Sequence, residues 1–228
     1  LAGACGMIAR RSVLGLLAGG AAAAGLGGCR LFTSRASYRF RMTIEGGGVT
    51  GSGVLQVSAA RLLALTAHEH PGSVGLKGEA VVLDLPDGPV FALLTIGDGK
   101  PLLATRVTLA LDPEADSLDA GKFVQAVRAL GRPFARARAE LPRRDWPLMV
   151  RFADIADPAS VERVDPETAG IFSIMLETTR DPVTTGIERR LGWLGKYPEP
   201  RLDRNYRGSA NPTLSQRLSY GDFRRGEK

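Results

Sequence analysis

Apolar and polar residues alternate along residues 37–45, which places four apolar side chains on one face of an extended segment. Those apolar positions are Tyr38, Phe40, Met42 and Ile44. A period of two is typical of a strand that is buried on one face only. Glycine-rich turn residues follow at 46–53, and residues 54–58 form a second apolar run. The pattern therefore predicts a β-hairpin.

Further short apolar runs predict more strands, at residues 79–85, 90–96, 106–111, 146–152 and 171–177. The first two runs are joined by Pro86-Asp87-Gly88, which supplies proline and glycine where a tight turn needs them. Strands joined by such short connections are expected to pair antiparallel.

The period changes to three and four within residues 116–130, which predicts an amphipathic helix that ends at Gly131. Its apolar stripe consists of Phe123, Ala126, Val127 and Leu130. A second short helix is predicted over residues 186–194, with Thr184 or Thr185 as its cap. Its inward-facing residues are expected to be Ile187, Leu191 and Leu194.

Two Asp-Pro pairs, Asp157-Pro158 and Asp165-Pro166, predict short helices or turns, because aspartate caps a helix and proline suits its first position. Strands are numerous and helices are few and short. We therefore expect an α+β fold, a mostly antiparallel β-sheet with a few short helices.

The N-terminal residues carry a different pattern. Arg10 and Arg11 precede an apolar run over residues 13–26, which is shorter than the about 20 residues that a membrane-spanning helix needs. A positive segment, a short apolar run and small residues before a cleavage point are typical of a secretory signal peptide. We interpret residues 1–28 as such a signal peptide, with Met7 as its true start.

The apolar run ends in Leu26-Gly27-Gly28-Cys29, which resembles the lipobox of bacterial lipoproteins. The resemblance implies that Cys29 is acylated, that it becomes the first mature residue and that membrane lipid is a partner. It also implies a place in the bacterial cell envelope, facing the periplasm or the outside. Arg10-Arg11 is similar to a twin-arginine export signal, although Ala9 and Gly15 depart from that pattern, so the export route stays open.

The only two cysteines are Cys5 in the predicted leader and Cys29. The mature domain is therefore expected to hold no disulfide, catalytic thiol or cysteine-bound zinc. The net charge is +6, and the C-terminal residues 196–228 contribute eight basic and four acidic residues to it. Because the rest of the mature chain is then nearly neutral, we expect no nucleic-acid partner.

These observations divide the chain into four parts. The predicted parts are a signal peptide (1–28), an anchor and linker (29–36), a single α+β domain (37–195) and a basic, partly ordered tail (196–228). The tail is poor in aliphatic residues, which favours an extended or only partly ordered segment that is solvated and lies over the domain.

Candidate catalytic residues are scarce. His68 and His70 share a face if they lie on a strand, and both could then reach one metal ion. No third ligand is indicated nearby, and an exposed loop explains the pair equally. Asp154, Asp157 and Asp165 could supply paired carboxylates, but two of them precede proline and already have a structural role. The serine-hydrolase motif Gly-x-Ser-x-Gly is absent.

Four blocks resemble segments shared by a group of proteobacterial proteins to which no activity is assigned. They begin at Tyr38, Gly78, Arg151 and Leu176. This resemblance implies that the body is one unit. We expect a lipid-anchored envelope protein with a binding or structural role. Another envelope protein is a possible partner, and no cofactor is expected. The alternative is a periplasmic metal-dependent hydrolase that uses His68 and His70.

Overall fold

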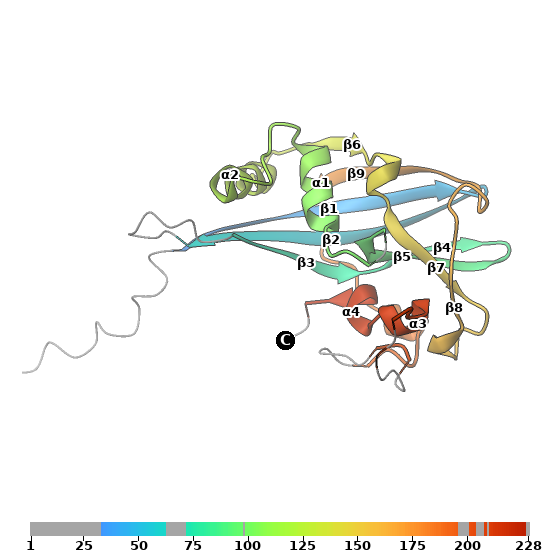
Figure 1. Ribbon diagram of the computed structural model, residues 1–228. Helices are drawn as coiled ribbons and strands as arrows, with labels where there is room; N and C mark the ends of the chain where they lie inside the picture. The colour runs from blue at the N-terminus through green and yellow to red at the C-terminus, as the bar shows by residue number, and fades with distance from the viewer. Residues whose placement is uncertain are drawn as a thin grey trace, which may run out of the picture.

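The computed structural model describes residues 33–62, 72–97, 99–195, 201–203, 208 and 210–226. Within these residues, ten strands form two antiparallel sheets that are accompanied by four short α-helices (Figure 1). This architecture confirms the predicted α+β class with its mostly antiparallel sheet.

The first sheet has six strands in the order β10-β3-β2-β1-β9-β6. Their bounds are β1 Thr33–Gly46, β2 Val49–Leu62, β3 Ser73–Glu79, β6 Arg138–Glu140, β9 Ile171–Thr179 and β10 Arg224–Arg225. The predicted hairpin is β1 and β2, and it turns at Gly47 and Gly48, whose φ angles of 56° and 76° favour glycine. Because β1 begins at Thr33, the first sheet takes in residues that were assigned to the linker.

The second sheet has four strands in the order β4-β5-β7-β8. Their bounds are β4 Val81–Leu85, β5 Gly88–Ile96, β7 Pro147–Phe152 and β8 Val161–Arg163. The run 79–85, predicted as one strand, is divided between the two sheets. Glu79 ends β3, and the Ala80 amide donates to the Phe223 carbonyl oxygen (2.7 Å) before β4 begins at Val81.

The strand predicted over residues 106–111 is wrong, because those residues belong to helix α1 (Leu103–Leu111). The helix buries Leu103, Val107 and Leu111, which recur every fourth residue and face the first sheet. The predicted amphipathic helix is α2 (Ala120–Leu130), capped by the Asp119 side chain and ended at Gly131. Short 3-10 helices are η2 Arg143–Asp145, η3 Pro158–Ser160 and η4 Ile187–Arg189.

Two apolar cores lie on opposite faces of the second sheet. The first fills the space between the inner faces of both sheets, α1 and α2. The second lies between the other face of β5 and β7 and the C-terminal segment, which includes α3 (Leu214–Arg217) and α4 (Tyr220–Phe223). Burial on both faces explains why residues 90–96 are apolar without alternation.

The C-terminal segment differs from the predicted solvated tail. Among its described residues, Leu202, Leu218, Tyr220 and Phe223 are buried in the second core. Figure 1 shows α3 and α4, in red, lying beside the second sheet. The folded unit therefore extends on both sides of the predicted 37–195 boundaries.

Candidate functional site

Several predicted site residues lie outside the described residues. They are Arg10, Arg11, Cys29, His68 and His70. The lipidated leader and the metal-dependent hydrolase therefore stay predictions. In the described ranges, no group of three or more histidine, cysteine, aspartate or glutamate residues could hold a metal ion.

The candidate carboxylates serve local turns. Asp154 Oδ1 accepts from the Ala156 amide (2.9 Å), and Asp157 Oδ1 accepts from the Ala159 amide (2.9 Å) at the start of η3. Asp165 accepts from the hydroxyl of Thr168 (2.9 Å). Asp157 and Asp165 therefore act in the local turns that the sequence predicts, and Asp154 accepts a hydrogen bond of the same kind.

Thr184 does not cap the helix that follows it, contrary to our expectation, because Gly186 occupies the N-cap position without a side-chain cap. Instead Thr184 pairs with Val54 at the edge of β2. Thr184 Oγ1 accepts from the Val54 amide (2.8 Å), and the Thr184 amide donates to the Val54 carbonyl oxygen (3.0 Å). The hydroxyl thereby completes the hydrogen bonds of β2 near the point where β3 leaves it. The predicted burial of Ile187, Leu191 and Leu194 is confirmed.

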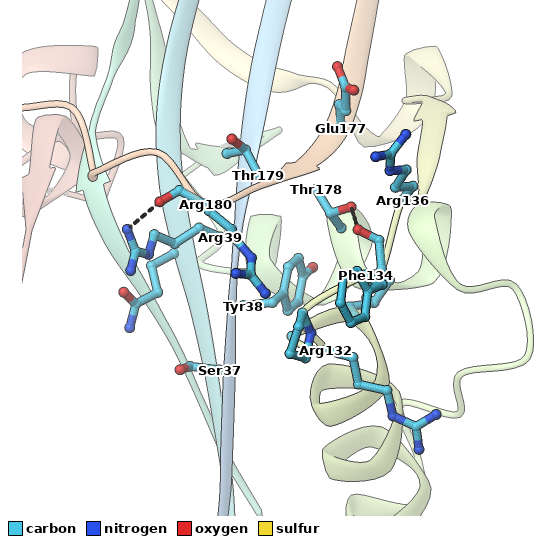
Figure 2. Close-up of a pocket in the computed structure, with 15 residues that line it drawn as sticks. Ser37, Tyr38, Arg39, Arg132, Phe134, Arg136, Glu177, Thr178, Thr179 and Arg180 are labelled. Carbon is cyan, nitrogen blue, oxygen red and sulfur yellow. Dashed lines mark hydrogen bonds between the residues drawn. The ribbon is translucent and has the colours of Figure 1, made fainter.

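A large open cleft lies between β1, β9 and the loop that connects α2 to β6 (Figure 2). Its volume is about 800 Å³. Its charged lining residues are Arg39, Arg132, Arg136, Arg180 and Glu177. We call this site the arginine cleft. Four guanidinium groups and one carboxylate line it, so the cleft carries a formal excess of positive charge.

The strand β1 places Arg39 in the cleft, because its side chain alternates with the buried Tyr38 and Phe40. The guanidinium of Arg39 donates to the carbonyl oxygens of Arg180 (3.0 Å) and Asp181 (2.8 Å). These bonds hold the segment that directly follows β9 against β1 (Figure 2).

The loop after α2 is held against β9 and β1 by contacts at both of its ends. Thr178 Oγ1 accepts from the Ala137 amide (3.0 Å) and donates to the Ala135 carbonyl oxygen (3.1 Å). At the other end, Gly131 packs so closely on β1 that an added Cβ would lie 2.4 Å from the Ser37 carbonyl oxygen. The loop therefore presents Arg132, Phe134 and Arg136 from a fixed base.

Three of the cleft arginines are exposed and have guanidinium groups without a protein partner among the described residues. Arg132, Arg136 and Arg180 form no side-chain hydrogen bond or ion pair with any residue that the structure describes. Their positive charges are therefore available to a ligand. Carboxylates and phosphates match the planar donors of a guanidinium group.

The neighbouring carboxylate of Asp181 is already paired. Thr179 donates to Asp181 Oδ2 (2.9 Å), and Arg41 forms an ion pair with the same oxygen. The Thr179 hydrogen bond and the Arg41 guanidinium hold the pKa of Asp181 below its usual range. Asp181 is thus ionised at neutral pH and compensates Arg41.

The floor and rim of the cleft are aromatic. Burial raises the pKa of Tyr38 well above its usual value, and its hydroxyl shares a hydrogen bond with Thr108 Oγ1 (2.9 Å). Tyr38 therefore stays protonated and does not act as a base. At the rim, the Phe134 side chain is 92% exposed. The arrangement can bind an anion but assembles no nucleophile beside a general base.

A second, smaller pocket of about 290 Å³ differs in its electrostatics. There Arg143 forms an ion pair with Glu167 and lies over the Trp146 ring (5.3 Å to the centroid). The positive charge is already matched, so this pocket is a weaker candidate for an anion.

No family model, curated protein or solved structure matches the chain. The resemblance of the four sequence blocks stays a prediction. Among the helices that the structure describes, none is long and apolar enough to cross a membrane.

Sequence reasoning missed the arginine cleft. A signal was present, because residues 120–139 contain five basic residues and no acidic one. The apolar stripe of α2 predicts the helix but does not indicate this charge. In the basic C-terminal segment, by contrast, Arg224 forms an ion pair with Glu188 (3.3 Å).

Proposed function

We propose that this protein is a non-enzymatic binding module of the bacterial envelope, attached to lipid through acylated Cys29, that captures an anionic group in the arginine cleft. The observation that carries the binding role is the set of three guanidinium groups, at Arg132, Arg136 and Arg180, that line one cleft and pair with no protein group in the described part of the chain. Clustered like charges repel one another, and a bound carboxylate or phosphate relieves that repulsion.

The form of the cleft supports binding of a group on a larger or mobile ligand. The cleft is open to solvent, and its lining residues come from one face of the first sheet and from the loop between α2 and β6 (Figure 2). The exposed ring of Phe134 adds an apolar surface beside the arginines. An arginine paired with an aromatic ring suits an anion that carries a planar or apolar part.

Calorimetric titration of the full chain with pyrophosphate tests the cleft. We expect binding that weakens as salt is raised, since the contacts are ionic. Arg136→Ala and Arg180→Ala are each expected to lower the affinity by at least about tenfold, because a charge-assisted hydrogen bond contributes about 1.5–3 kcal/mol.

Arg189→Ala is the matched control, because Arg189 is an exposed arginine on η4 whose side chain forms no hydrogen bond or ion pair within the described ranges. It is expected to leave the affinity unchanged. Equal losses in all three variants, or no binding to the unaltered chain, would remove the cleft from the proposal.

The anchor is tested by labelling cells with radioactive fatty acid. We expect the label on the unaltered chain and its loss in Cys29→Ala, because the thiol is the acceptor in the lipobox chemistry. The variant is also expected to lose processing after Gly28. Labelling and processing that persist in Cys29→Ala would contradict the anchor without bearing on the cleft.

A further inference from the structure

Helix α2 and the loop after it form a continuous basic surface. From residue 120 to residue 139 the chain has no acidic side chain. The helix buries one face against β1 and β2, with Phe123, Val127 and Leu130 among the buried residues. Its exposed face carries Lys122, Gln125 and Arg128. Because the core takes up the apolar face of α2, the basic face is the one available to a partner, and clustered Lys and Arg side chains attract anionic lipid surfaces.

Two exposed apolar side chains flank this helix. Leu118 is 97% exposed just before α2, and Phe134 is 92% exposed in the loop after it. Among the described residues, every other exposed large apolar residue has an exposed fraction of 58% or less. Leucine and aromatic side chains favour the boundary between headgroups and acyl chains.

The basic surface lies at the end of the sheet where β1 begins (Figure 1). Arg128 donates to Ser34 Oγ (2.8 Å), and Gly131 packs on Ser37. Four residues lie between Cys29 and Ser34, and the five residue steps from one to the other span at most about 18 Å. This inference rests on the proposed anchor at Cys29. If Cys29 is acylated, the short connection keeps α2 within reach of the bilayer.

We propose that this surface docks on an anionic lipid bilayer. The docking face consists of Leu118, Lys122, Arg128, Arg132, Phe134 and Arg136. Leu118 and Phe134 enter the interfacial region, and the four basic side chains contact lipid phosphates. Figure 2 shows that the Arg132 side chain extends away from Arg180, toward the outside of the cleft. Docking would fix the orientation of the arginine cleft relative to the membrane.

The docking face and the arginine cleft would both bind phosphate groups. Each of them has basic residues that the other lacks, so the two sites can be tested separately. Lys122 and Arg128 belong to the docking face alone, whereas Arg39 and Arg180 line the cleft alone. Lys122 lies 3.6 Å from Asp116, which compensates part of its charge. Arg128 has only the neutral hydroxyl of Ser34 as its hydrogen-bond partner in the described ranges.

Vesicle sedimentation of the full chain tests the docking face. All chains carry Cys29→Ala, so that acylation does not hide weaker binding and every sample has the same leader. We expect more binding to vesicles of phosphatidylethanolamine and phosphatidylglycerol than to phosphatidylcholine. Lys122→Glu with Arg128→Glu is expected to lower this binding by at least about tenfold, since each basic residue contributes appreciably at an anionic surface.

Lys77→Glu with Arg189→Glu is the matched control, because it changes the net charge equally at two exposed residues outside the docking face. Circular dichroism and thermal unfolding verify that each variant folds. The Lys122/Arg128 variant is also expected to keep the pyrophosphate affinity of the cleft. Equal binding by the docking-face variant and the control would overturn the proposal.

Phe134→Trp reports insertion directly. We expect its fluorescence to shift to the blue with phosphatidylglycerol vesicles and not with phosphatidylcholine, against the unaltered chain with Trp146 and Trp193 as background. No shift would place Phe134 outside the bilayer and contradict docking. Absence of fatty-acid label from the unaltered chain, with vesicle binding of the Cys29→Ala chains retained, would instead remove the anchor alone.

Discussion

Glu79 is a buried carboxylate at the point where the chain passes from the first sheet to the second. Only 5% of the residue is exposed, and Glu79 Oε2 accepts from the Ile187 amide (2.9 Å). Burial raises the pKa of Glu79, and hydrogen bonds from the Ile187 and Gly186 amides partly oppose that shift. The folded chain therefore binds this proton more tightly than the unfolded chain.

This raised pKa predicts a pH-dependent effect of Glu79→Gln. The wild-type contribution is fully present below the unfolded pKa of 4.5 and is lost as pH rises through the higher folded pKa. Glutamine still accepts from the Ile187 amide and carries no charge. We expect Glu79→Gln to gain stability over the wild type more at about pH 7 than at about pH 4, measured by urea unfolding.

Asp84→Asn provides the opposite sign as a control. The Arg190 side chain donates to both carboxylate oxygens of Asp84 and lowers its pKa. That contribution is present above the unfolded pKa and is lost as pH falls, so this variant loses most at neutral pH. A stability difference for Glu79→Gln that does not vary with pH would contradict the assignment.

At the scale of elements, the hairpin and α2 were predictable because each has one buried and one solvated face. Arg39 and Arg41 face outward between buried residues of β1, and Lys122 and Arg128 mark the exposed face of α2. Asp119 adds a capping signal before α2. Pattern and cap together indicate both the type of element and its boundary.

Helix α1 lacks those signals. Its N-cap is Leu102, which makes no side-chain cap, and its last turn has no basic residue. The run from Arg106 to Leu111 contains the β-branched residues Val107 and Thr108, which favour a strand when taken alone. Tertiary packing decides for the helix, because Leu103, Val107 and Leu111 cover the first core together.

The arginine cleft combines elements that are distant in the chain. Arg39 lies 141 residues from Arg180, and the loop with Arg136 falls between them. Periodicity shows which side of a strand a residue occupies, but it does not show that β9 pairs with β1. The carboxylates at 157 and 165 were predictable from the sequence, because an Asp-Pro pair acts through its nearest neighbours.

At the scale of the whole molecule, the C-terminal segment forms a third layer on the second sheet. Four of its apolar residues are buried in the second core, together with Ile187, Leu191 and Leu194. The four are Leu202, Leu218, Tyr220 and Phe223. Composition alone predicts a solvated tail, because these few apolar residues are spread among arginine, proline and serine. Burial depends on the position of a few large side chains, not on their average frequency.

Phe223 is the centre of this layer and provides its test. Its side chain is fully buried, with the rings of Phe91, Phe152 and Trp193 at centroid distances of 6.3, 5.9 and 5.8 Å. Phe223→Ala is expected to cost about 3–5 kcal/mol in urea unfolding, because it leaves a cavity among these rings. Phe172→Ala, at a residue 58% exposed on β9, is expected to cost far less. If both variants unfold at the same urea concentration, the C-terminal segment contributes no core, and the second sheet must be stable with one face uncovered.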